Sequence, residues 1–583
     1  MAASNTRLIV WVTALGMLIL AAMSVAVFFL VEEKPPGLAA EPRWLHVKVS
    51  GALPDAPGTD TLLVDPADLP PLSTEMAQAI RDAASDPEVA GVLFEVESVS
   101  LGWARAQELR AAIASVADAG KPCVAWAGAL TNQELYLATG CPTVQAPPAA
   151  LVFVNGLSVT QTYYRGLFDR FKISPNFEHV GDFKSAVEPY ERTGPSEAAA
   201  QATDALLDSL YGQFIEGIAA GRGVDAEAAR AWVDDPPMTA ADAQARGMID
   251  ALKYRDEAFI EAMGEDPDPI PFRDYLRDRR AAWSSGAGVV AVLYAEGAII
   301  DGSSAQDLFG SQYIGDRTLR RQLADLREDD DVKAVVLRVN SPGGSGQASD
   351  SIWREVARLK EEKPVVVSMA DYAASGGYYI SMGANRIFAE PGTLTGSIGV
   401  FGGKINLSGA LAEFGVSTHT SRRGRYSTLL SGMHDFDEAE RAKFKAFLAG
   451  FYDVFVTKAA EGRGMSPEAL HAVAQGRVWT GAQALEHGLV DELGGLDAAV
   501  AHAAELGGIT GTPELRRVPQ RKGFLEQIME DLQNPEPNAQ ATAGALALVP
   551  GAAEAAAQLA LLDAVVGPGG PVLLLPGAPW SLR

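Results

Sequence analysis

Two parts of the chain repeat each other at a nearly constant spacing. Short matching segments recur 241 or 242 residues apart across more than 100 residues. The matching pairs are Lys121-Pro122 with Lys363-Pro364, Gly221-Arg222-Gly223 with Gly462-Arg463-Gly464, and Gly247-Met248-Ile249-Asp250 with Gly488-Leu489-Val490-Asp491. A constant offset over such a length indicates tandem duplication. The 583 residues are therefore expected to form two related copies, since so long a chain exceeds one hydrophobic core.

The second copy contains a pattern that is typical of parallel β-strands. Two apolar runs rich in β-branched residues, 334–340 and 364–370, flank a helix-patterned segment, 347–362. Continuous apolar runs in strand–helix–strand order predict a βαβ unit in a buried parallel sheet. The first copy shows the same order, with strands expected at 45–51, 91–98 and 122–128 and helices at 75–84 and 104–119. The sequence thus predicts an α/β fold.

Chemically useful residues follow both strands of this βαβ unit. Ser341-Pro342-Gly343-Gly344 ends the first strand, and Ala374-Ser375-Gly376-Gly377 ends the second. Carboxyl ends of neighbouring strands are where α/β sheets place their sites. Ser375 could act as a nucleophile while the N–H groups of Gly344 and Gly376 hold an oxyanion. The alternative is that both glycine pairs are plain turns and that Ser375 only caps a helix.

The two copies differ where this chemistry would lie. The first copy has Val99-Ser100-Leu101 opposite the glycine turn, and Gln133 or a near neighbour opposite Ser375. It also has GDFKSAVEPY at 181–190, which puts Lys184 opposite Arg425 or Tyr426. The first copy therefore lacks the nucleophile and supplies a lysine instead.

A serine nucleophile requires a general base. The chain has seven histidines, of which none lies between Ser375 and His419, and none is marked by its surroundings. Lys184 is flanked by apolar Phe183, Ala186 and Val187, a context in which burial would lower its pKa enough for it to serve as a base. A distant histidine, or a solvated lysine with no role, remains open from the residues alone.

Charge and composition exclude several classes of partner. The net charge of −26 argues against nucleic acid and against a broad basic membrane-binding surface. No cluster of residues has metal-ligand spacing, so neither a metal nor a cofactor is expected. Cys123 and Cys141 could pair in an oxidising compartment, although Cys123 lies in an apolar strand where a buried free thiol is the commoner outcome.

The N-terminal segment predicts a membrane anchor. Residues Leu8 to Val31 form an uncharged apolar run of 24, long enough to span a bilayer. Arg7 precedes the run and Glu32 and Glu33 follow it, which favours a cytoplasmic N-terminus and an extracytoplasmic body. A cleaved signal peptide is the alternative.

The chain resembles the long form of the signal peptide peptidase A (protease IV) family, peptidase family S49. The resemblance covers about 44–505 together with the N-terminal anchor. The segments that carry it are RVNSPGGS (338–345), AASGGYYIS (373–381), TLTGSIGVFG (393–402), GDFKSAVEPY (181–190) and VWTGAQALEHGLVDELG (478–494).

This resemblance implies tandem ClpP/crotonase-like domains and a Ser-Lys dyad. By resemblance Ser375 is the nucleophile, Lys184 the base and Ser397 the residue that orients the lysine, with Gly344 and Gly376 as oxyanion donors. It also implies a homotetramer in the bacterial inner membrane, with the catalytic body on the periplasmic side. Whether Lys184 meets Ser375 within one chain or between chains stays open.

The domain organisation expected from these features has five parts. They are the cytoplasmic N-terminus and anchor (1–34), a lysine-bearing domain (44–251), a linker (252–286), a serine-bearing domain (287–505) and an Ala/Pro/Gly-rich tail (520–583). Within the tail, 544–565 is interpreted as a packed helix and 572–577 as a last strand.

Two functions of different classes follow. The first is a membrane-anchored serine endopeptidase that degrades cleaved signal peptides and other unfolded apolar peptides. The second is a non-proteolytic ClpP/crotonase-like body, either a membrane scaffold or a thioester enzyme, which would not need both Ser375 and Lys184. The presence of both residues favours the peptidase.

Overall fold

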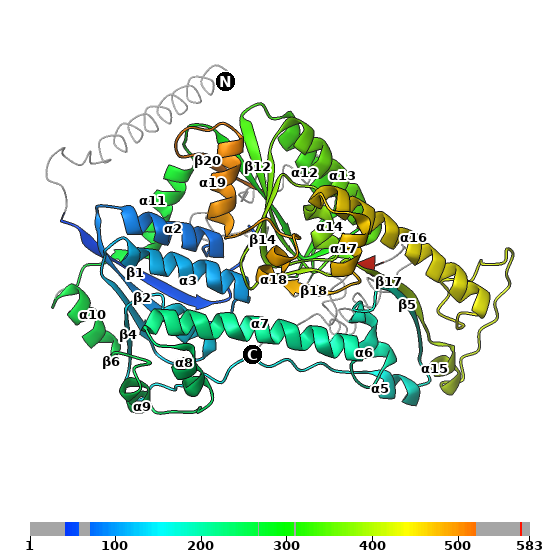
Figure 1. Cartoon of the computed structure of the whole chain (residues 1–583), viewed down its shortest axis with the longest axis horizontal. Coiled ribbons are helices and arrows are strands. Elements are labelled where there is room, and N and C mark those ends of the chain that lie inside the picture. The colour runs from blue at the N-terminus through cyan, green and yellow to red at the C-terminus, as the bar shows by residue number, and fades with distance from the viewer. Residues whose placement is uncertain (1–40, 58–69, 266, 308–310, 520–571, 574–583) are drawn as a thin grey trace, which may run out of the picture. The chain divides into compact units, whose positions relative to one another are not determined.

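The computed structural model describes residues 41–57, 70–265, 267–307, 311–519 and 572–573 (Figure 1). From Arg43 onward these residues belong to one compact unit. The expected anchor at 8–31 and the expected helix at 544–565 lie outside the described residues. Among the residues that are described, no helix is both long and apolar enough to cross a membrane.

The first copy is built on a parallel sheet of six strands. The strand order is β6-β4-β3-β2-β1-β7, and each neighbouring pair is parallel. The bounds are β1 (Arg43–Gly51), β2 (Val89–Val99), β3 (Cys123–Ala127), β4 (Thr143–Ala146), β6 (Ala251–Leu252) and β7 (Ile270–Pro271). The connecting helices α2 (Ser73–Ser85), α3 (Trp103–Asp118) and α4 (Asn132–Ala138) bury their apolar side chains in the same core as the strands. The strands and helices expected in this copy are confirmed.

The second copy is built on the corresponding sheet. Its main path is β18-β16-β14-β12-β8-β20, with β15 and β19 continuing from β14. The strands are β8 (Val289–Glu296), β12 (Val332–Ser341), β14 (Val365–Ala374), β15 (Arg386–Ala389), β16 (Leu394–Gly396), β18 (Val478–Thr480), β19 (Glu492–Leu493) and β20 (Glu514–Val518). Helices α12 (Asp316–Glu328), α13 (Gly346–Glu362), α14 (Gly376–Ser381) and α19 (Leu496–Leu506) pack with them. The predicted βαβ unit is β12-α13-β14.

The internal repeat is visible in the topology. The strand order β6-β4-β3-β2-β1 of the first copy recurs as β19-β15-β14-β12-β8 in the second. A helix of 26 residues lies in each copy, α7 (Glu197–Arg222) and α16 (Glu438–Arg463), and each ends at a glycine with φ 63°. The last residue of each helix is an arginine that forms a bidentate ion pair with an aspartate, Arg222 with Asp250 and Arg463 with Asp491. The short helices α8 (Ala226–Val233) and α9 (Ala240–Ala245) match α17 (Pro467–Val473) and α18 (Gly481–Glu486).

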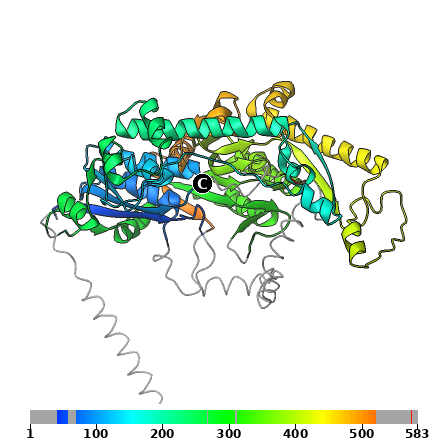
Figure 2. The ribbon, with the colours of Figure 1, turned by 90° about the horizontal axis from the view of Figure 1, so that it is seen from below.

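A third sheet combines strands from both copies. Its order is β10-β11-β9-β13-β21-β17-β5. The bounds are β5 (Ser174–Val180), β9 (Ala298–Ile300), β10 (Ala305–Gln306), β11 (Gln312–Gly315), β13 (Gly344–Ser345), β17 (Val400–Asn406) and β21 (Val572–Leu573). Strand β5 of the first copy runs antiparallel to β17 of the second over its whole length (Figures 1 and 2). The first copy thus extends a segment onto the second, flanked by α5 (Arg165–Arg170), η2 (Ser185–Val187), α6 (Glu188–Glu191) and α15 (Ser408–Glu413).

The stretch expected to connect the two copies is itself folded. It contains α10 (Arg255–Met263) and α11 (Phe272–Trp283). Tyr275, Leu276 and Trp283 of α11 are buried in the core of the first copy, and the Trp283 indole N–H donates to Asp82 over 2.8 Å.

Buried ion pairs join the two copies. Arg338 of β12 is 1% exposed and donates to Asp55 over 3.0 and 3.1 Å and to Glu108 over 2.9 Å. Burial alone would raise the pKa of Asp55, but Arg338 holds this pKa below its usual value. Arg105 of α3 forms a second ion pair, with Asp371 of β14. Since removing one partner would leave a buried charge unpaired, these contacts fix the copies in one arrangement.

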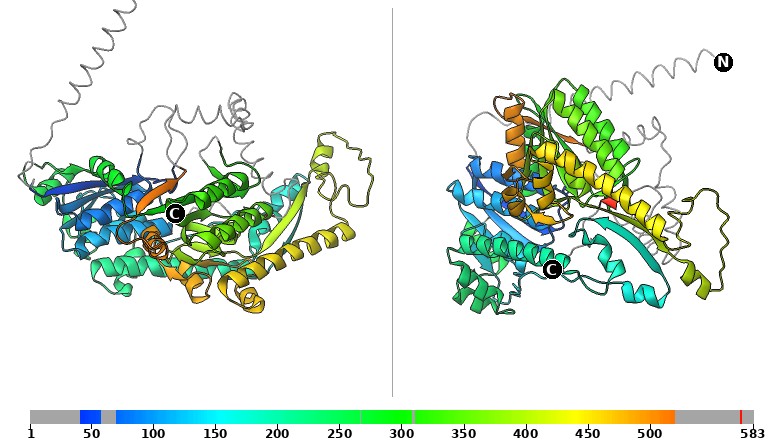
Figure 3. Two further views of the ribbon diagram at one scale, coloured as in Figure 1. Left: turned by 90° about the horizontal axis from the view of Figure 1, so that it is seen from above. Right: turned by 45° about the vertical axis from the view of Figure 1, so that its right-hand side comes forward.

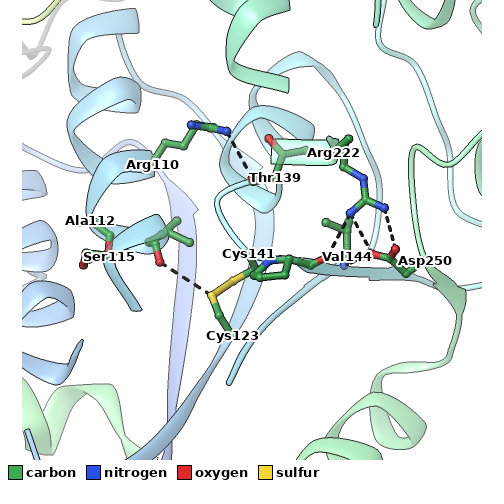
Figure 4. Close-up of a disulfide and its surroundings, with 11 residues drawn as sticks. Arg110, Ala112, Ser115, Cys123, Thr139, Cys141, Val144, Arg222 and Asp250 are labelled. Carbon is green, nitrogen blue, oxygen red and sulfur yellow. Dashed lines mark hydrogen bonds and ion pairs between the residues drawn. A yellow bond between two sulfur atoms is a disulfide. The ribbon is translucent and has the colours of Figure 1, made fainter. Parts of the chain in front are cut away.

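The two cysteines form a disulfide within the first copy (Figure 4). Cys123 begins β3 and Cys141 lies two residues before β4, and their Cα atoms are 5.2 Å apart. Because β3 and β4 are neighbouring parallel strands joined through α4, their first residues are brought side by side. Of the two states that the sequence left open for these cysteines, the structure has the bonded one, which a local apolar pattern could not indicate because the partner is 18 residues away.

Candidate active site

The site is assembled at the carboxyl ends of β12 and β14. These strands are parallel neighbours, and the register places Ser341 beside Ala373. The chain leaves β12 through Pro342 and Gly343, and leaves β14 through Ser375 directly into helix α14. Figure 3 shows these central strands with the helices of the second copy around them. The glycine turn and the serine are consequently adjacent, as the sequence predicted.

Ser375 has a backbone conformation that few residues other than glycine adopt. Its φ is 55° and its ψ is −112°. Its N–H donates to the carbonyl of Gly396 over 2.8 Å, which helps to hold this sharp turn. Such a conformation costs on the order of 1–3 kcal/mol and is stable only where the surroundings enforce it. Ser375 occupies the N-cap position of α14, but its hydroxyl makes no capping hydrogen bond and faces Lys184 instead.

Lys184 of the first copy reaches Ser375 of the second within one chain. Its Nζ lies 3.0 Å from Ser375 Oγ, 3.0 Å from Ser397 Oγ and 3.0 Å from the Ser397 carbonyl oxygen. Lys184, Ser375 and Ser397 are all 0% exposed. The structure therefore brings together, within one chain, the three side chains predicted for the site.

Burial lowers the pKa of the Lys184 ammonium from about 10.5 to about 7. Desolvation is the cause, because a charged amine loses its hydration in the interior. A large fraction of Lys184 is then neutral near pH 7. A neutral amine has two N–H groups and one lone pair. The Ser397 carbonyl can only accept, so it takes one N–H; with the other directed at Ser397 Oγ, the lone pair is left for the Ser375 hydroxyl.

The position of Lys184 depends on close packing by the second copy. Lys184 directly precedes η2, and the N–H of its neighbour Phe183 donates to the Gln475 carbonyl over 2.9 Å. Gly476 has φ 78°, and a Cβ at this position would lie 2.6 Å from Lys184 Cβ. A Cβ at Gly399 would lie 3.2 Å from Lys184 Cδ. The sequence did not identify Gly476 as a residue that positions Lys184, although this glycine lies two residues before the family segment 478–494.

The two glycines predicted as oxyanion donors are in close contact. A Cβ at Gly376 would lie 3.2 Å from the Gly344 nitrogen. Gly376 is the first residue of α14, where N–H groups have no partner inside the helix. The Ile299 N–H donates to the Gly343 carbonyl over 2.9 Å. Because the Gly343 carbonyl and the Gly344 N–H point in opposite directions across one trans peptide, the Gly344 N–H faces away from β9.

The first copy has a different residue where the second has Ser375. Thr131 caps α4, the helix that corresponds to α14, so it occupies the equivalent position as a near neighbour of the expected Gln133. Across the described part of the chain, none of the seven histidines hydrogen-bonds to Ser375. Nor do the described residues contain a group of His, Cys, Asp or Glu side chains able to hold a metal ion.

Comparison with known protein families finds one family in both copies of the chain. A family model described as peptidase family S49 matches residues 115–266 and again residues 357–510. The chain is 34% identical over 441 residues to the chloroplastic serine protease SPPA of Arabidopsis thaliana, covering 74% of this chain and 65% of that protein. It is 33% identical over 450 residues to Protease 4 of Salmonella typhi, covering 74% and 71%.

Shorter relatives match one part of the chain. A putative signal peptide peptidase SppA of Enterococcus faecium is 39% identical over 206 residues, which is 35% of this chain and 60% of that protein. Among solved structures, a point mutant of ClpP1 from Listeria monocytogenes is 17% identical and covers 36% of this chain and 94% of its own, at a TM-score of 0.24, too low to support an argument.

Gly476→Ala is expected to displace Lys184 and to abolish at least nine-tenths of any hydrolytic activity that depends on Ser375. The added Cβ would overlap the lysine stem, while the fold loses only about 1–3 kcal/mol. Gly464→Ala is the matched control, because Gly464 also has a positive φ but no atom within 4 Å of an added Cβ. Similar melting temperatures and similar activities for the two variants would contradict the assigned role of Gly476.

Proposed function

This chain belongs to peptidase family S49 and is a serine peptidase, and from that premise we propose that it is an endopeptidase in which Ser375 is the nucleophile and Lys184 the general base. The observation that carries this proposal is the 3.0 Å contact between the buried Lys184 amine and Ser375 Oγ. The lowered pKa of Lys184, to about 7, gives the amine a neutral form able to accept a proton at physiological pH.

The proposed reaction is acyl transfer in two stages. Neutral Lys184 accepts the Ser375 hydroxyl proton as Oγ attacks the peptide carbonyl, and the N–H groups of Gly344 and Gly376 stabilise the resulting oxyanion. The Lys184 ammonium then donates that proton to the leaving amine. A water molecule, deprotonated by Lys184, hydrolyses the Ser375 ester and regenerates both side chains. Ser397 positions the amine throughout, through the two contacts of 3.0 Å.

We infer that the two copies are tandem ClpP/crotonase-like domains, spanning about 44–251 and 287–505, with 252–286 connecting them and a tail from 520 to 583. The repeated strand order and the two family matches support this division. The site requires both copies, since the first supplies Lys184 and the second supplies Ser375 and its glycines.

The proposed substrates are cleaved signal peptides and other unfolded apolar peptides. The support is the name of the Enterococcus faecium relative, a putative signal peptide peptidase. The apolar run at 8–31 would anchor the chain in the bacterial inner membrane, with the body on the periplasmic side. Such placement would bring the site to the surface where signal peptides are released. The disulfide agrees with an oxidising compartment.

The repeat also supports assembly into a homotetramer. Helices α5 and α15 occupy equivalent places in the two copies. With the spacing between these helices, the first-copy segment equivalent to β17 is 157–163, and the second-copy segment equivalent to β5 is 417–423. Residues 417–423 are exposed, and neither segment forms a strand in the described structure. Within one chain, β5 of the first copy pairs with β17 of the second. By the same geometry, 417–423 of one chain would pair with 157–163 of a neighbouring chain. Repetition of this head-to-tail contact between chains would close a ring.

Ser375→Ala and Lys184→Met are each expected to reduce hydrolysis of a leucine-rich peptide by at least about a thousandfold. Each variant removes one reacting group while leaving the packing nearly intact, and Lys184→Met also removes the penalty of burying an amine. The measurement is peptide turnover by the full chain, with melting temperatures as the check on folding. The control is Lys360→Met, which alters a lysine of α13 whose amine donates to the backbone carbonyls of Gly383 and Ala384.

Retained turnover in Lys184→Met would exclude the dyad and point to another base. Absence of turnover in the folded wild-type chain, with several apolar peptides, would favour the non-proteolytic scaffold.

The pH dependence of kcat/KM is expected to follow the titration of Lys184. Activity rises as pH increases through about 7 and levels off above it, because only the neutral amine can accept the Ser375 proton. The measurement is kcat/KM from about pH 5.5 to about pH 9 with an uncharged peptide. A profile that is flat between those limits would be inconsistent with a titrating lysine base.

The proposed membrane location and the proposed homotetramer are both tested on the full chain. The protein is expected to remain with membranes after extraction at high pH and, once dissolved in detergent, to have the mass of a tetramer. Replacing Thr418 by proline, which removes a strand N–H from the exposed segment 417–423, is expected to shift the mass toward smaller species. A chain that leaves the membrane without detergent, or that is a monomer at micromolar concentration, would contradict these two proposals respectively.

A further inference from the structure

A short strand of the C-terminal tail lies between two strands of the candidate site. Strand β21 (Val572–Leu573) runs antiparallel to β13, with Leu573 opposite Gly344 and Val572 opposite Ser345. On its other side Val572 is also paired with Phe401 of β17. Figure 1 shows this strand as the red arrow next to β17. More than 50 residues separate β21 from β20, the preceding described strand.

The strands on either side of β21 are otherwise two separate pieces of sheet. Strand β13 pairs with β9 along its other edge, and β17 pairs with β5 along its other edge. Within the described residues, β21 is the one strand that joins these pieces. Without it, β13 and β17 would present facing edges with free N–H and C=O groups. Such edges bind an extended peptide by adding it to the sheet.

This edge is directly beside the reacting groups. The Gly344 N–H points away from β9 and therefore toward β21. The same Gly344 nitrogen lies close enough to Gly376 that an added Cβ would be 3.2 Å away, and Gly376 directly follows Ser375. A strand opposite Gly344 therefore passes the predicted oxyanion donors, where a scissile carbonyl would have to lie.

We propose that the edge between β13 and β17 binds peptides as an added antiparallel strand, and that the chain's own Val572–Leu573 segment occupies this edge and competes with substrate. This inference rests on the proposed peptidase function, whose substrate it describes as an extended apolar segment. The tail is chemically suited to this role, because Val572 is followed by three leucines and the run lies between Pro571 and Pro576.

The strength of the competition follows from tethering. A strand of two residues makes few hydrogen bonds, so as a free peptide it would bind weakly. Attachment to the same chain raises its effective concentration, which lets a weak ligand fill the edge until a longer peptide displaces it. The tail thus sets a threshold for substrates: peptides that pair along more of β13 and β17 displace it, and short ones do not.

The first experiment removes the pairing capacity of the tail. In Val572→Pro/Leu573→Pro both backbone N–H groups of β21 are lost, and neither residue belongs to the reacting groups. The KM for a leucine-rich peptide is expected to fall roughly three- to tenfold, with kcat unchanged. The matched control places the same two prolines at Ser581 and Leu582 of the same tail and should leave KM at the wild-type value.

A second experiment does not depend on turnover. The same proline pairs are introduced into Ser375→Ala, and the dissociation constant of a labelled peptide and the hydrogen exchange of the β13 and β17 amides are measured. The prolines at 572 and 573 are expected to tighten peptide binding and to speed exchange at the Gly344 and Phe401 amides. A synthetic PVLLLPG peptide should compete with the labelled peptide and slow this exchange again.

The outcomes separate the two proposals. Equal dissociation constants and equal exchange rates for the two proline pairs would overturn the role of the tail, whether or not the wild-type chain is active. Absence of turnover in wild type, together with tighter binding and faster exchange in the Val572→Pro/Leu573→Pro variant, would keep the peptide-binding edge and overturn the peptidase mechanism instead.

Discussion

The structure depends on an amine that is buried with no counterion among the described residues. The hydrogen-bond partners that the described residues give to Lys184 Nζ are serine oxygens, and burial lowers its pKa to about 7. Because the unfolded chain binds a proton at this lysine up to about pH 10.5 and the folded chain does not, stability falls as pH decreases from about 10.5 to about 7 and this loss is complete below pH 7. The cost near neutral pH is a few kcal/mol, which the rest of the fold must offset.

Several long-range contacts provide that support. The β5–β17 ladder carries the lysine segment onto the second copy, and the backbone of Gln475 and Gly476 holds it there. The ion pairs of Arg338 and Arg105 lock the two sheets at the level of β12 and β14, a few residues before the glycine turn and Ser375. A site in which groups must stay within hydrogen-bond distance requires such rigid supports.

Much of this arrangement could be predicted from the sequence, because the information was local or repeated. The constant offset indicated two copies, the apolar runs indicated β12 and β14, and the glycines marked the turn beside Ser375. The loss of those residues in one copy and the gain of Lys184 indicated a site shared between copies. Family resemblance, and not periodicity, singled out Ser397.

What the sequence did not predict depends on contacts between distant segments. The pairing of β5 with β17 joins segments more than 200 residues apart, and neither segment has a pattern that identifies its partner. The Cys123–Cys141 bond follows from the adjacency of β3 and β4, and the role of Gly476 follows from the approach of Lys184. Strand β21 was expected, but nothing in its residues indicated that it would lie against Gly344.

The separation of the proposed dyad along the chain has a consequence for biosynthesis. Lys184 precedes Ser375 by 191 residues. Gln475 and Gly476, whose backbone packs against the lysine segment, follow Ser375 by about a hundred residues. A ribosome therefore completes the first copy, with its amine, long before the nucleophile exists. Hydrolytic competence would arise only when translation is nearly finished and the second copy has folded onto the first. Under the proposed mechanism, a chain whose second copy has not yet folded would therefore be unable to cleave peptides.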